Sequence, residues 1–151
     1  MNRPVHYEDF QVGLSGRHGA YPVTAEEVRA FAAEFDPQPF HLDEAAARAS
    51  ILGRLCASGW HVCAVMNRLI VEAYASDAAG MGSFGIDEVR WERPVYVGDI
   101  LTLHYELLAK RRSKSRPEMG ILTFHWQLHD HDGTRKLDAR GTNLMAVREA
   151  G

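Results

Sequence analysis

The chain has 151 residues, a formal net charge of -3 at pH 7 and the apolar and charged content of an ordinary globular protein. This length favours one domain, residues 1–151, with its own hydrophobic core. The slight negative charge gives no general attraction to nucleic acid or to an anionic membrane, and no apolar run approaches the roughly 20 residues of a membrane span.

The N-terminal segment MNRPVHYEDF lacks the apolar core of a secretory signal. If Cys56 and Cys63 are both helical, they lie too far apart for a disulfide. A reducing compartment is the default for such a chain. We therefore expect a cytoplasmic protein with neither a membrane nor a nucleic-acid partner.

A weakly apolar strand and an amphipathic helix are predicted first. Residues 17–23 can form the strand. Thr24 is a typical helix N-cap, and Glu27 three residues later completes a capping box. Apolar residues then recur at helical spacing up to residue 35.

The stretch 35–43, Phe-Asp-Pro-Gln-Pro-Phe-His-Leu-Asp, follows this helix. Its two prolines end the helix and favour extended backbone in the residues before them. We expect a stiff, extended turn that fixes Asp36 and His41 relative to each other at low entropic cost. A helix stop with a surface Asp and His explains the same residues, and composition alone favours that simpler interpretation. Asp43 then caps a second short helix.

The longest helical pattern begins after Ser58-Gly59 and continues to about residue 74. Its apolar residues cover more than one face, which is typical of a buried helix. Alternation and turn signals then predict strands at 84–97, 100–110, 120–130 and 136–148. Helices followed by antiparallel strands in series predict an α+β fold, with a curved antiparallel sheet wrapped around the long central helix.

Three motifs in this order resemble the MaoC-like hydratase/dehydratase family, which comprises (R)-specific enoyl-CoA hydratases with a hot-dog fold. An Asp is followed by a proline-containing turn and a His five residues later, here Asp36 and His41. A glycine opens the central helix, here Gly59. The segment 93–99 matches the pattern Arg-Pro-Val-x-x-Gly-Asp between strands. The resemblance covers roughly residues 10–148.

The resemblance implies a catalytic mechanism and a set of site residues. Asp36 and His41 would hold a water molecule and transfer its protons in a syn addition to an enoyl thioester. The backbone N–H of Gly59, at the start of a helix, would stabilise the negative charge on the thioester oxygen. Gln38, Ser58 and Trp60 are the expected substrate-binding residues.

The family also implies partners for this chain. Coenzyme A would enter as part of the acyl thioester substrate, with no separate cofactor and no metal. Two copies would pair into a homodimer or a higher homo-oligomer, with the acyl pocket near their interface.

Three positions depart from the family pattern. Phe35 stands where the family usually has Gly, Gln38 where it has Asn, and Ser58 where it often has His. These departures put the substrate in question more than the fold. A hot-dog thioesterase and a non-catalytic acyl-thioester-binding protein therefore remain alternatives. A thioesterase needs a carboxylate near the carbonyl carbon, and the central helix offers only Glu72, far from Gly59.

The remaining polar groups have simpler interpretations. The histidines of the later strands lack the spacing of a metal site, and both cysteines are more typical of small core residues than of nucleophiles. The basic run over residues 110–116 is typical of a solvated hairpin tip. The same run is suited to contact the phosphates of coenzyme A.

Overall fold

The computed structural model describes residues 4–148. Six strands form one antiparallel sheet, with β1 beside β4, β4 beside β5, and β5 beside β6; β2 and β3 both pair with β6 along its other side. The strands are β1 (Ser15–Pro22), β2 (Gly80–Gly82), β3 (Ile86–Trp91), β4 (Ile100–Arg112), β5 (Met119–His129) and β6 (Arg135–Ala146).

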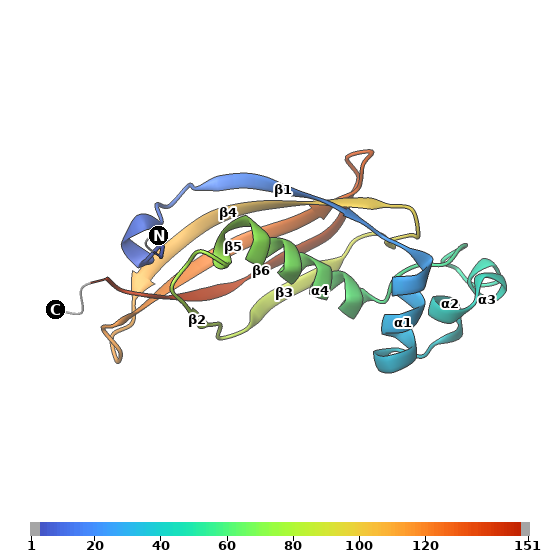
Figure 1. Ribbon diagram of the computed structural model, residues 1–151, viewed down its shortest axis with the longest axis horizontal. Coiled ribbons are helices and arrows are strands. Elements are labelled where there is room, and N and C mark those ends of the chain that lie inside the picture. Colours follow the sequence, from blue (N-terminus) through green and yellow to red (C-terminus); the bar gives the residue numbers. More distant parts are fainter. Residues whose placement is uncertain (1–3, 149–151) are drawn as a thin grey trace.

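The helices lie in front of the sheet and at both of its ends (Figure 1). They are the short η1 (Tyr7–Asp9), α1 (Ala25–Phe35), α2 (Pro39–Leu42), α3 (Glu44–Arg48) and α4 (Gly59–Ile70), and the wider π-helical turn η2 (Val71–Ala75) extends α4. Among the described residues, no helix is long and apolar enough to cross a membrane.

The core lies between α4 and the inner face of the sheet. Alternate residues of β4 and β5 point inward and are almost fully buried, as the period of a strand requires, and they include Leu103, Phe124 and Leu128. Val62, Val65, Met66, Leu69 and Ile70 of α4 pack into the same cluster. The predicted curved sheet around a long helix is therefore confirmed.

The predicted strand 84–97 and the predicted burial of the central helix both need correction. The predicted strand 84–97 ends at Trp91, because the chain then crosses to residues 55–57, where the N–H of Ala57 bonds to the carbonyl of Val95 at 2.8 Å. The central helix is not buried all round, since Trp60 remains 64% exposed.

The proline-rich turn is extended only in its first half. Gln38 has extended backbone, with φ -90° and ψ 141°, but Pro39 then occupies the first position of the one-turn helix α2, which contains His41. The expectation of extended backbone throughout 35–43 is therefore wrong. Proline suits this position because its fixed φ is helical and its missing N–H has no partner there in any helix.

Replacing Leu69 by alanine is expected to lower the free energy of unfolding by about 3 kcal/mol, because the side chain lies in the core and leaves a cavity. Urea denaturation measures this change. Asn67→Ala, an exposed position on the same helix, is the matched control and should stay within about 0.5 kcal/mol of the wild type. A loss below 1 kcal/mol for Leu69→Ala, estimated against the same control, would contradict the described packing of α4.

Candidate active site

A carboxylate is held at the end of α1. Asp36 is the C-cap of that helix, and its N–H bonds to the carbonyl of Ala32. The hydroxyl of Ser58 donates to Asp36 Oδ2 at 2.6 Å, and the side-chain amide of Gln38 donates to Oδ1 at 2.5 Å. These two hydrogen bonds, Ser58 first, lower the pKa of Asp36 against the opposing effect of burial. Asp36 is therefore a carboxylate near neutral pH.

The imidazole of His41 faces this carboxylate from α2. The ring is buried, and Nδ1 lies 2.7 Å from the carbonyl oxygen of Cys56. Because a carbonyl only accepts hydrogen bonds, this contact assigns the proton of the neutral ring to Nδ1 and leaves the lone pair on Nε2. Nε2 lies 3.5 Å from Asp36 Oδ2. A proton acceptor and a carboxylate thus converge on one point.

The start of α4 forms a third part of the site. Gly59 is the first residue of the helix, a position whose N–H has no partner within the helix. Ser58 is the N-cap, and its Oγ accepts from the N–H of Trp60 at 3.3 Å. Free N–H groups and the helix dipole make this end favourable for negative charge.

Trp91 of β3 explains why residue 59 must be glycine. Its indole Nε1 donates to the carbonyl of Gly59 at 2.9 Å. A Cβ at position 59 would lie only 2.7 Å from Cε2 of the same ring. The indole of Trp60 meets that of Trp91 edge-on, with centroids 5.2 Å apart. An aromatic wall therefore stands beside the N-terminus of α4.

These groups surround one open cavity of about 520 Å³. It lies at the end of the molecule where α1, α2 and the start of α4 meet the end of β3 (Figure 1). Its walls are mostly apolar beyond the Asp-His pair, as in many small-molecule sites. The lining residues used below are Asp36, Phe40, His41, Gly59, Leu52 and Trp91.

The structure brings five of the six expected site residues to this cavity: Asp36, Gln38, His41, Gly59 and Trp60. Ser58 is fully buried and does not line it; this residue lies behind Asp36 and bonds to the carboxylate. Sequence reasoning missed two contributions, the Cys56 carbonyl that orients His41 and the covering position of Trp91. A backbone carbonyl leaves no residue-type signal, and the contact of Trp91 with Gly59 joins residues far apart in the sequence.

Other reactive groups lie away from this constellation or are unsuited to react. Glu72 lies in η2, beyond the C-terminal end of α4, where it pairs with Arg68 at 3.3 Å and approaches His18 at 3.9 Å. Burial raises the pKa of the Cys56 thiol to about 11, so it is not a thiolate near neutral pH. Within residues 4–148, no group of three or more His, Cys, Asp or Glu side chains is arranged to hold a metal ion.

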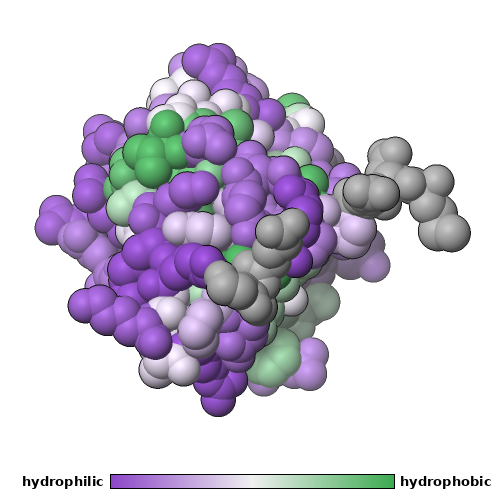
Figure 2. Space-filling view, turned by 90° about the vertical axis from the view of Figure 1, so that its left-hand side faces the viewer, coloured by the Kyte–Doolittle hydropathy of each residue, from purple (hydrophilic) through white to green (hydrophobic). Residues whose placement is uncertain are grey.

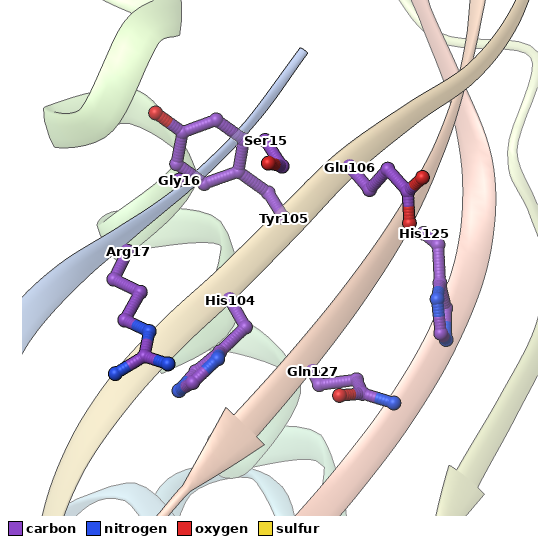
Figure 3. Close-up of a pocket in the computed structure, with 8 residues that line it drawn as sticks. All are labelled: Ser15, Gly16, Arg17, His104, Tyr105, Glu106, His125 and Gln127. Atoms are coloured by element: carbon purple, nitrogen blue, oxygen red, sulfur yellow. The ribbon is translucent and has the colours of Figure 1, made fainter. Parts of the chain in front are cut away.

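A second, smaller hollow of about 240 Å³ lies on the outer face of the sheet. Figure 3 shows Arg17 and His104 side by side there, with Gln127 and His125 on the neighbouring strand. Several of its polar groups already have protein partners: His125 Nε2 lies 2.7 Å from Asp138 Oδ1, and His104 stacks on His129. This hollow lacks the converging acid, base and helix N-terminus of the first cavity.

Comparison with known proteins agrees with these observations. Residues 13–123, most of the chain, match the MaoC like domain family. The chain belongs to the MaoC-like family. The hot-dog fold predicted from the sequence is confirmed by structural relatives of this MaoC-like chain.

Three relatives illustrate the similarity of this MaoC-like chain to known proteins. A MaoC-like dehydratase from Rhodospirillum rubrum has 37% sequence identity and a TM-score of 0.84, and the match covers 96% of this chain and 99% of that chain. The uncharacterized protein YdeM of Bacillus subtilis (strain 168) is 32% identical over 117 residues, 77% of this chain and 81% of YdeM. The R-hydratase PhaJ1 from Pseudomonas aeruginosa, at 22% identity and a TM-score of 0.76, shares the fold over 97% of this chain and 88% of its own.

Replacing Ser58 by alanine is expected to raise the pKa of Asp36 towards that of an ordinary aspartate, because the variant loses the strongest stabilising hydrogen bond to the carboxylate. Titration of the labelled carboxyl carbon by NMR measures this shift. The depressed pKa stabilises the wild type above the unfolded pKa of Asp, and this contribution is lost as the pH falls through the folded value. The variant should lose part of that stabilisation at neutral pH.

The matched control is Ser50→Ala, because the Ser50 hydroxyl bonds to the carbonyl of Ala47 and not to Asp36. An Asp36 pKa that stays the same in Ser58→Ala would contradict the described geometry.

Proposed function

We propose that this protein is a hydratase/dehydratase that adds water to, or removes it from, an enoyl or 3-hydroxyacyl thioester of coenzyme A. The observation that supports this proposal most is the pair formed by the Asp36 carboxylate and the Nε2 lone pair of His41, 3.5 Å apart at the wall of an apolar cavity. The names of its relatives, which include a MaoC-like dehydratase and an R-hydratase, support the same reaction class.

In the hydration direction, a water molecule would be bound between Asp36 and His41. As its oxygen bonds to the β carbon, one proton passes to Nε2 of His41, and the electron pair of the double bond moves into the thioester as an enolate. The proton then returns from the Asp-His pair to the α carbon on the same face. Dehydration is the reverse sequence, and neither direction changes the oxidation state of the thioester.

The enolate oxygen would accept a hydrogen bond from the N–H of Gly59. This donor is fixed before the reaction by the N-terminus of α4, so it needs no reorganisation as charge develops. The hydrogen bond from Trp91 to the carbonyl of Gly59 fixes the following peptide, between Gly59 and Trp60, and so restrains the backbone of Gly59 from its other side. The acyl chain would lie against the apolar wall that includes Phe40 and Leu52.

Crotonyl-coenzyme A is the first substrate to test, by the loss of absorbance of its conjugated double bond. We expect Asp36→Asn and His41→Ala to lower kcat by about 100- to 10,000-fold, as is usual when a positioned acid or base is removed. His104→Ala, on the outer face of the sheet, is the matched control and should retain activity. Equal turnover in all three variants would refute the assignment of the pair, and release of free thiol without hydration would favour a thioesterase.

We also propose that the protein is a homodimer formed through the edge of β3. Among the described residues, β3 pairs only with β6, so its other edge is open. Five large apolar side chains are exposed on this side of the molecule: Trp60, Met81, Phe84, Ile86 and Trp91. An open strand edge beside exposed apolar groups needs cover. Antiparallel pairing of two β3 strands about a two-fold axis supplies it.

Phe84→Asp is expected to weaken this dimer, because it places a charge among the apolar side chains beside β3. Light scattering at micromolar concentration should give a dimer for the wild type and a larger monomer fraction for the variant. Val12→Asp is the control, since Val12 is similarly exposed but lies next to β1, on the other edge of the sheet. A wild-type monomer would disprove the dimer, and equal effects of the two variants would place the interface elsewhere.

A further inference from the structure

The hairpin between β4 and β5 presents a cluster of cations to solvent. Within its basic run, Arg111, Lys114 and Arg116 are exposed. Among the described residues, the ion pairs are formed by cationic side chains other than these three. Glu118 is the acidic residue of the same loop, so the tip keeps a net positive charge in a chain whose formal net charge is -3. Figure 2 looks onto this end of the molecule, where hydrophilic residues cover most of the surface between separate apolar patches.

The hairpin tip has a defined conformation. Arg112 donates two hydrogen bonds to the carbonyl of Pro117, at 3.0 and 3.1 Å. Ser113 is buried, and its Oγ accepts from the N–H of Arg116 at 3.1 Å. A backbone fixed in this way presents its cations at lower entropic cost than a flexible loop. The arrangement is therefore suited to bind a multiply charged anion.

Within one protomer, this tip is far from the cavity. The register of the sheet aligns four residues in one row: Trp91, Leu137, Leu128 and Leu103. From Leu103, β4 continues to Arg112, a length of about 30 Å at the usual rise of a strand. Helix α2 and the start of α4, which line the cavity, accordingly lie at the opposite end of the molecule from the hairpin between β4 and β5 (Figure 1).

The proposed dimer changes this relation, because a two-fold axis through the middle of β3 reverses the direction of the partner. The hairpin end of one protomer then lies beside the cavity end of the other. The usual distance between neighbouring strands and the rise per residue along a strand place the partner's hairpin tip about 20 Å from Trp91. The hairpin tip of the same chain is farther from Trp91 than that. An extended pantetheine arm spans about 15 Å from the sulfur to the first phosphate, and an arginine side chain can bridge the remaining distance.

We propose that Arg111, Lys114 and Arg116 of one protomer bind the phosphates of the coenzyme A whose acyl group lies in the cavity of the other. This inference rests on the proposed function and on the β3 dimer. Arginine and lysine bind phosphate through charge-assisted hydrogen bonds. The reactive Asp-His pair and the phosphate site of each substrate therefore belong to different protomers.

The first test replaces the three residues by alanine and compares two substrates, crotonyl-coenzyme A and the crotonyl thioester of N-acetylcysteamine, which has no phosphates. We expect KM for the coenzyme A substrate to rise about 30-fold, because the variant loses three contacts with phosphate. Each of these contacts is exposed to solvent and therefore weaker than a buried ion pair. Hydration of the short thioester should stay within about twofold, given the usual size of surface effects. The control variant replaces three exposed arginines elsewhere on the surface, Arg17, Arg48 and Arg140, by alanine, so the change in net charge is the same.

Equal effects of the two triple variants, or equal effects on the two substrates, would overturn the proposal. Impaired use of a thioester on acyl carrier protein, with unchanged use of the coenzyme A thioester, would also overturn it and favour an acidic protein partner. If the wild type hydrates neither thioester, the proposed function fails. Calorimetric titration with free coenzyme A then still tests the cluster, with tight binding expected in the wild type and about tenfold weaker binding in the variant.

Mixed dimers test whether the hairpin acts on the partner. One chain carries Asp36→Asn and the natural hairpin, while the other carries the intact site and the three alanines. In the mixed dimer, the intact cavity faces the natural hairpin of its partner, so KM for crotonyl-coenzyme A should return to the wild-type value. A KM that stays raised would place the hairpin and the cavity in the same protomer and refute the inference.

Discussion

The packing of α4 against the inner face of the sheet determines the position of everything else in the site. Its buried residues, from Val62 to Ile70, fix the axis of the helix in the core. The N-terminus of the helix is thereby held against β3, where Trp91 packs on Gly59. Burial of apolar area, a non-directional force, thus positions a directional group, the free N–H at the start of a helix.

One hydrogen bond connects this helix to the proline-rich turn. Ser58 accepts from the N–H of Trp60 and donates to Asp36, so a single hydroxyl caps α4 and orients the carboxylate. His41 is fixed independently by the carbonyl of Cys56, three residues before Gly59. Hydrogen bonds to the segment 56–58 therefore hold the carboxylate and the imidazole beside the helix N-terminus, which is the preorganisation that the proposed catalysis requires.

The sequence predicts what depends on local pattern and leaves out what depends on contacts between distant segments. Alternation located β4, β5 and β6 to within a few residues, and the Asp-Pro-x-Pro-x-His spacing identified Asp36 and His41 as neighbours. The same spacing gave the wrong backbone for His41, because a proline can end one helix and begin another. The contact of Trp91 with Gly59 joins residues 32 positions apart and follows only from the assembled sheet.

The departures from the family pattern are best understood through the charge on Asp36. A histidine before Gly59 would be a titrating neighbour of the carboxylate, so the charge of that neighbour would change with pH. The Ser58 hydroxyl donates a hydrogen bond of 2.6 Å and carries no charge at any pH of interest. Gln38, one methylene longer than asparagine, still reaches Oδ1 from two residues away. The carboxylate is therefore stabilised by two neutral donors, which leaves His41 as the group beside it that takes up a proton in the proposed reaction.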